Sequence, residues 1–201
     1  MFEIDKWAMH KLEELKAKTT EFYDKYEFYS LFQEITYFCS MEMSSFYLDI
    51  VKDRLYCEGT TSIERRSAQT VLTEVLKVLV RIISPVLSFT ADEIWERIPE
   101  ALKEEESVHL SKWIEANPEY LNEELAKKWD KIARLRREVN KKLEAERQTG
   151  LIGHSLDARV LLNIANDEYS FIKDYTENEV SDLFIVSQVK FVNDSLAESE
   201  I

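Results

Sequence analysis

Five basic side chains recur at helical spacing between residues 127 and 141 and could bind a phosphate backbone. At 100° per residue they fall on one side of a helix and apolar residues fall on the other. Each phosphate that Lys or Arg neutralises adds a salt-sensitive increment to affinity. The basic residues are Lys127, Lys131, Arg134, Arg137 and Lys141, and the apolar ones are Leu125, Trp129, Ile132, Leu135, Val139 and Leu143. The alternative is a charged face that only meets solvent.

Two further arginines, Arg136 and Arg147, fall on the apolar side of the same helix. A guanidinium is costly to bury without a partner. Each is therefore either turned toward a nucleic acid from the junction between two domains or held in a structural ion pair with a carboxylate.

A second polar cluster is predicted where one helix ends and the next begins. The loop between them, residues 58–62, would bring both groups to one end of a helical bundle. Arg, Gln and Tyr are suited to stacking on unpaired RNA bases and bonding to their edges. The cluster comprises Lys52, Arg54, Tyr56, Arg65, Arg66 and Gln69. The alternative is helix-end chemistry, in which these charges serve the helix termini and their neighbours.

Nothing in the sequence favours catalysis or a metal site in this chain. His10, His109 and His154 are far apart in unrelated contexts, and Cys39 and Cys57 form no Cys-x-x-Cys pair. The acidic run at residues 104–106 is typical of a solvent-facing segment. Three glycines in 201 residues leave no Gly-rich loop to cradle phosphates. We therefore expect no catalytic residue, no metal and no cofactor here.

Hydrophobic periodicity predicts long helices in the first three quarters of the chain. A helix that is apolar nearly all round should lie centrally, and Pro85 should end it. Thr90, with Glu93 three residues on, predicts an N-cap that opens a short helix. Gly150 and Gly153 should end the last long helix. The predicted helices span residues 4–19, 27–51, 62–83, 90–98 and 121–147, with a loop over 99–118.

The spacing of the apolar residues changes after residue 150. Alternating and β-branched residues predict strands over 154–164 and 183–192, with a short helix over 167–175 between them. The polar end, 193–201, is predicted to be a frayed tail. The fold class predicted is mainly α: a helical bundle followed by a small α+β appendage.

Composition limits the class of protein and of partner. The chain is 45% hydrophobic and 11% aromatic, enough for a packed core, and no apolar run approaches the length that spans a bilayer. Its net charge of −13 argues against general nucleic-acid binding, yet residues 127–147 carry nine basic and four acidic groups. We expect a cytoplasmic protein that binds neither DNA nor membrane.

Several segments together resemble the tRNA-binding region of isoleucyl-tRNA synthetases, which are class I aminoacyl-tRNA synthetases. They are SFYLDIVKDRLY at 45–56, ERRSAQTVL at 64–72, SFTADEIW at 88–95, SVHLSKW at 107–113 and GLIGHSLDA at 150–158. The family's ATP-site signatures, of the His-x-Gly-His and Lys-Met-Ser-Lys-Ser types, are absent. The chain also stops before the Cys-rich zinc module of many bacterial members. An initiator Met directly before a helical segment, with no catalytic domain ahead, suggests a piece excised from a longer enzyme.

The resemblance implies a domain order and a function. It implies a helical anticodon-binding domain over 1–118, a connecting basic helix over 119–149 and a small junction domain over 150–192. The expected partners are the anticodon stem-loop of isoleucine tRNA and the remaining domains of the parent synthetase, which would use ATP, Mg and in some members Zn. The chain itself would not be an enzyme. The alternative is an acidic helical scaffold that binds proteins and no RNA.

Overall fold

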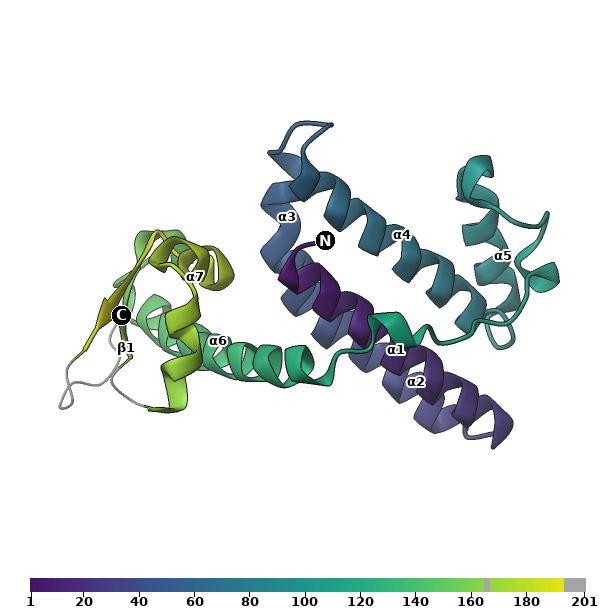
Figure 1. The fold of residues 1–201 in the computed structure, drawn as a ribbon, viewed down its shortest axis with the longest axis horizontal. Coiled ribbons are helices and arrows are strands. Elements are labelled where there is room, and N and C mark those ends of the chain that lie inside the picture. The colour runs from purple at the N-terminus through teal and green to yellow at the C-terminus, as the bar shows by residue number, and fades with distance from the viewer. Residues whose placement is uncertain (165–166, 194–201) are drawn as a thin grey trace. The chain divides into compact units, whose positions relative to one another are not determined.

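The computed structural model describes residues 1–164 and 167–193, which form two compact units, the second beginning at Glu124. The first unit is helical, and the second combines helices with a two-stranded sheet (Figure 1). The predicted fold class, mainly α with a small α+β appendage, is confirmed. The functional boundaries drawn at residues 118, 149 and 192 remain predictions.

The first unit is built on α1, which packs against α2 and α4 (Figure 1). The apolar residues of α1 from Ile4 to Leu15 are all buried. Trp7 of α1 meets Phe46 edge to face, with ring centroids 5.0 Å apart. The helices are α1 (Glu3–Asp24), α2 (Phe28–Tyr37), a π-helical segment η1 (Phe38–Leu48), α3 (Asp49–Tyr56), α4 (Ile63–Ile83) and α5 (Ser88–Arg97).

The helix predicted over residues 27–51 is divided by the π-helical segment η1. Phe38 and Met43 are both buried and lie five residues apart, which is the hydrogen-bond spacing of a π-helix. The wider turn thus keeps both side chains in the core. Periodicity at 3.6 residues cannot reveal such a change.

Thr90 is not an N-cap, so that prediction was wrong. Helix α5 begins at Ser88, and the amide of Ala91 already donates to the carbonyl of Leu87 at 2.9 Å. After Ile83 the chain makes a tight turn in which the amides of Val86 and Leu87 both donate to the Ile83 carbonyl. This turn starts the next helix two residues earlier than the Thr90 pattern indicates.

One carboxylate, that of Asp5, joins four elements of the first unit. Asp5 is fully buried and accepts hydrogen bonds from the Tyr47 hydroxyl at 2.8 Å and from the Ser67 hydroxyl. The Arg54 guanidinium lies 3.9 Å from it and 4.8 Å from the centre of the Phe2 ring. Burial and the neighbouring Asp5 charge raise the pKa of Tyr47 well above its ordinary value, so its hydroxyl stays a donor.

The segment over residues 111–122 returns along α1 in the opposite direction (Figure 1). The Trp113 indole donates to the Thr20 hydroxyl at 2.9 Å, and its ring meets Tyr23 edge to face. Further along, the backbone amide of Asn117 donates to the carboxylate of buried Glu13 at 2.6 Å, and the backbone amide of Asn122 donates to His10 Nδ1 at 2.9 Å. We call residues 111–122 the strap. It includes the 3₁₀ turn η4 (Pro118–Tyr120), and two further turns, η2 (Glu100–Leu102) and η3 (Val108–Leu110), precede it.

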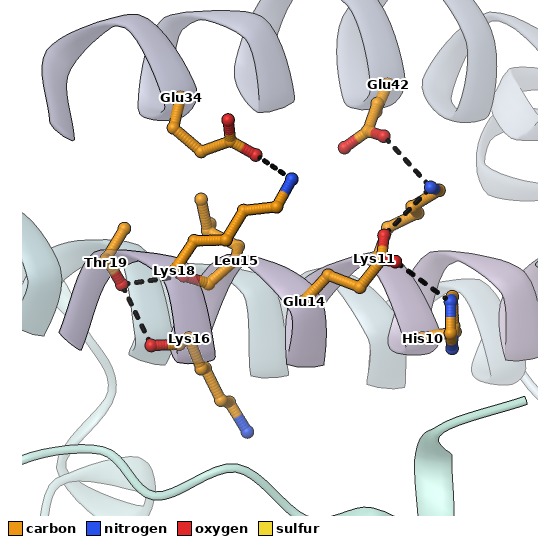
Figure 2. Close-up of polar contacts among 9 residues, drawn as sticks. All are labelled: His10, Lys11, Glu14, Leu15, Lys16, Lys18, Thr19, Glu34 and Glu42. Atoms are coloured by element: carbon orange, nitrogen blue, oxygen red, sulfur yellow. Dashed lines mark hydrogen bonds and ion pairs between the residues drawn. The ribbon is translucent and has the colours of Figure 1, made fainter. Parts of the chain in front are cut away.

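Ion pairs close the seam between α1 and the α2–η1 segment (Figure 2). Lys18 pairs with Glu34 at 2.6 Å, while Lys11 lies 2.9 Å from Glu14 and 3.6 Å from Glu42. Burial raises the pKa of Glu42 to about 7, against the opposing effect of the Lys11 charge. Glu42 is thus the member of this seam that titrates near neutral pH.

The second unit combines α6 (Glu123–Thr149) with a parallel β pair. Strand β1 (Arg159–Asn163) runs beside β2 (Gln188–Val192), with Arg159 opposite Gln188 and Asn163 opposite Val192. Gly150, at φ +79°, ends α6 as predicted, with the amides of residues 150 and 151 donating back to Arg147 and Glu146. The short helix predicted over 167–175 is the 3₁₀ helix η6 (Asp167–Asp174), and another 3₁₀ turn, η5 (Ser155–Asp157), precedes β1.

The second strand is shorter than predicted because part of its range is helical. Helix α7 (Glu177–Phe184) was missed, although Thr176 and Glu179 form a capping box at its start. The apolar run from Leu183 therefore begins inside a helix, and β2 starts only at Gln188. The predicted tail beyond 193 lies outside the described residues.

We predict that Asp5→Ala lowers the free energy of unfolding by about 3 kcal/mol, because buried donors and a partly buried guanidinium lose their shared acceptor. Urea denaturation at pH 7 measures the change. Asp24→Ala, an exposed position on the same helix, is the control and should change stability by less than about 0.5 kcal/mol. Equal effects of the two substitutions would contradict the role given to Asp5.

We predict that Glu42→Gln becomes more stabilising as pH rises. The folded protein keeps a proton on Glu42 up to about pH 7, whereas the unfolded chain releases it near the ordinary value of 4.5. The wild type therefore loses stability between these pH values, and the glutamine variant does not share this loss. The difference in unfolding free energy should grow by about 2 kcal/mol from pH 5 to pH 8. Glu21→Gln is the control, because the exposed Glu21 has its pKa lowered by Lys25, and this variant should not become more stabilising as pH rises.

Candidate functional site

The cluster predicted at the α3–α4 end of the bundle is built by a short loop. The Cys57 amide ends α3 by donating to Asp53, and the Ser62 hydroxyl accepts from the Arg65 amide to begin α4. All six predicted residues lie on α3 or α4, so the structure brings them to one end of the first unit. Their side chains divide into two groups by their partners.

Three of the six serve the fold or pair with a neighbour. Arg54 turns inward to Asp5, and Arg65 donates to the backbone carbonyl of Glu58 at 3.0 Å, which fixes the loop. Lys52 pairs with Asp49 one turn away at 3.2 Å on the surface. These contacts match the helix-end alternative, although an exposed pair such as Lys52–Asp49 contributes little energy and exchanges readily.

Tyr56, Arg66 and Gln69 are the members left open to a ligand. All three are exposed, Tyr56 by 85%, and no hydrogen bond or ion pair engages their side chains within the described residues. An aromatic ring, a guanidinium and an amide can together stack on a base and bond to its edge. Ile63 is also exposed at this end of the unit. The sequence did not predict its exposure, because an apolar residue in a helical sequence is expected to be buried.

The basic stripe lies on the exposed side of α6. Lys127, Lys131, Arg134, Arg137 and Lys141 are exposed, as predicted, whereas Trp129, Ile132, Leu135, Val139 and Leu143 are buried. Leu125, predicted to be on the apolar side, is only partly buried.

The stripe is not uniformly basic. At 100° per residue, Asp130 and Glu138 fall in the same sector. Glu138 accepts a hydrogen bond from Tyr169 at 2.9 Å, and the Lys131 ammonium lies 5.9 Å from the centre of the Phe171 ring. Arg134, Arg137 and Lys141 have no ion-pair partner in the described part of the chain, so they are the cations most available to an anion.

The two arginines assigned to the apolar side differ in the structure. Arg136 is buried, and its Nε donates to the Leu183 carbonyl at 2.8 Å, near the end of α7. Arg136 therefore supports the fold rather than facing a nucleic acid, and the partner that it is seen to bind is a backbone carbonyl. Arg147 is exposed rather than on a buried face, because the buried seam ends at Leu143, and it pairs with Glu144 at 2.5 Å.

The described residues contain no group of three His, Cys, Asp or Glu side chains that could hold a metal. No helix in the described ranges is long and apolar enough to cross a membrane. Cys39 and Cys57 are free thiols.

Comparison with known proteins gives a family match and close relatives. The family model described as "Anticodon-binding domain of tRNA ligase" matches residues 5–162. The chain is 47% identical over 192 residues to the isoleucine–tRNA ligase of Kosmotoga olearia, covering 95% of the chain and 21% of the relative. It is 47% identical over 194 residues to that of Petrotoga mobilis, and 44% identical over 194 to that of Syntrophotalea carbinolica. The chain spans about a fifth of the length of these relatives.

We predict that Arg136→Ala destabilises the second unit by about 2 kcal/mol, because it leaves a carbonyl unpaired and removes buried packing. Hydrogen exchange of the α7 and β2 amides measures this local effect. Arg137→Ala, at the exposed neighbouring position, is the matched control and should leave exchange unchanged. If both variants exchange alike, the buried contact of Arg136 does not support the fold.

Proposed function

The chain belongs to the family of anticodon-binding domains of tRNA ligases, and on that premise we propose that it binds the anticodon stem-loop of isoleucine tRNA. In this proposal it positions the tRNA for aminoacylation by a catalytic domain that lies elsewhere in an isoleucine–tRNA ligase. The resemblance found in the sequence is confirmed by the family match over residues 5–162 and by relatives that are isoleucine–tRNA ligases. The family match is the observation that carries the proposal.

Two surfaces, one at the α3–α4 end of the first unit and one on α6, suit different parts of an RNA. The exposed Tyr56, Arg66 and Gln69 suit unpaired bases, which are read by stacking and edge contacts. The exposed cations of α6 suit a phosphate backbone, which needs charge rather than base recognition. We propose that the first surface reads anticodon bases and the second follows the stem.

The proposal assigns binding and no chemistry to this chain. ATP, Mg and any Zn are proposed to belong to other parts of the ligase. We also propose that the protein acts in the cytoplasm, as part of translation. A role as an acidic scaffold without RNA is the outcome that the following test would favour if binding fails.

We predict that the chain binds isoleucine tRNA more tightly than a variant with substituted anticodon bases, and more tightly at 50 mM than at 200 mM salt. Fluorescence anisotropy with labelled tRNA measures both differences. Arg66→Glu and Lys131→Glu should each weaken binding about tenfold. The first should also reduce the preference for the native anticodon, whereas the second should mainly reduce the salt dependence.

Exposed lysines outside both surfaces supply matched controls. Lys112→Glu in the first unit and Lys173→Glu in the second make the same kind of charge change and should alter affinity less than about twofold. Binding that ignores salt, anticodon and both site substitutions would overturn the proposal.

A further inference from the structure

The outward side of the α2–η1 segment is exposed along its whole length. Its inward side packs on α1, where Leu31 and Phe38 are buried. We call the exposed side the outer face. It consists of ten residues spaced as pairs four apart: Phe28, Tyr29, Phe32, Gln33, Thr36, Tyr37, Ser40, Met41, Ser44 and Ser45.

The outer face carries no charge, although 32% of the chain's residues are charged. All ten of its residues lie in the described part of the chain, and none is Asp, Glu, Lys or Arg. The charged residues of the same segment, Glu34 and Glu42, instead turn toward α1 and its lysines (Figure 2). The segment thus has its charges on the packed side and its aromatic rings on the open side, the reverse of an ordinary surface helix.

Large apolar groups make the outer face unlike a solvated surface. Tyr29 is 77% exposed and Tyr37 54% exposed, and Phe32 and Met41 lie between and beyond them. A groove of about 640 Å³ runs over these side chains, with Gln33, Thr36 and Ser40 at its polar positions. Glu34 also borders this groove, but Lys18 neutralises it from α1. Contiguous apolar patches of this kind mark interaction sites.

The charges on and around the outer face narrow the class of partner. It has no Lys or Arg to neutralise phosphates, which disfavours RNA. A second copy is disfavoured because residues 1–123 carry 14 basic and 24 acidic groups, so two such units repel each other. The exposed lysines that flank the segment in sequence, Lys25 and Lys52, are paired with Glu21 and Asp49. The other exposed charges there, at positions 24, 27 and 53, are acidic. These features favour an apolar protein surface with a basic rim.

We infer that the outer face is the docking surface for another domain of the isoleucine–tRNA ligase. The relatives match over nearly the whole of this chain and are about five times as long. A similar helix in them therefore belongs to a protein with further domains on which it could pack. Ring-rich helical faces with i, i+4 spacing pack into apolar grooves between helices or strands. The inference rests on family membership and does not require the tRNA contacts proposed above.

The test uses a full-length chimera, in which this chain replaces the matching 192 residues of the Kosmotoga olearia ligase. The photo-crosslinker p-benzoylphenylalanine is placed at Phe32 or Tyr37, and at Phe89 as a control that is 93% exposed on α5. Irradiation is carried out without tRNA, and crosslinked peptides are identified by mass spectrometry. We expect crosslinks from positions 32 and 37 to the part of the same molecule outside this chain. Crosslinks to a second molecule, or no more crosslinks than from position 89, would overturn the inference.

A second measurement compares Tyr37→Glu in the chimera and in the isolated chain. A buried charge at an interface should lower the melting temperature of the chimera by at least about 3 °C. The isolated chain, in which Tyr37 is half exposed, should change by less than about 1 °C. Phe89→Glu is the matched control and should leave both proteins unchanged. Equal shifts of the two proteins would contradict docking at Tyr37, whatever the result of the tRNA titration.

Discussion

The buried carboxylate of Asp5 is the interaction on which the first unit depends. A charge without contact with water is stable only if its surroundings supply donors and an opposite charge. Here the donors come from Tyr47 on η1 and Ser67 on α4, and the charge comes from Arg54 on α3. Asp5 therefore fixes three elements against α1 at once. Nonpolar packing alone would hold them together without specifying their register so closely.

This constraint also determines which polar residues of α3 and α4 remain exposed to a ligand. Tyr47, Arg54 and Ser67 all belong to the segments by which the chain resembles its family, yet they point into the bundle rather than toward a ligand. Arg65 is similarly engaged with the loop carbonyl of Glu58. A motif shared by a family thus contains residues that hold the fold beside residues that the fold leaves exposed. Here the exposed ones are Tyr56, Arg66 and Gln69, which we propose for binding.

The sequence predicted what depends on local periodicity and missed what depends on distant partners. Helices α1, α4 and α6 and the exposed stripe follow from burial every three or four residues, and Gly150 ends α6 as its conformational freedom predicts. The π-helical turn, the inward direction of Arg54 and the pairing of Arg136 with Leu183 arise from contacts tens of residues away. The start of α7 was readable from the Thr176–Glu179 capping box, but a continuous apolar run beyond it favoured a strand. Surface pairs such as Lys52–Asp49 and Arg147–Glu144 follow the three-residue spacing of a helix. The distant partners of Arg54 and Arg136 have no signature in sequence spacing.

The strap has a consequence for how the protein folds. Its contacts join residues that are 93, 104 and 112 positions apart in the sequence. During synthesis, the strap residues that contact Thr20, Glu13 and His10 are therefore made long after α1. At about 5–20 residues per second on the ribosome, this delay lasts roughly 5–20 s. Closing so long a loop is also slow in free solution, because the chain loses conformational entropy before the stabilising contacts form. Until residues 111–122 have been made, the side of α1 that the strap covers therefore stays open to other chains.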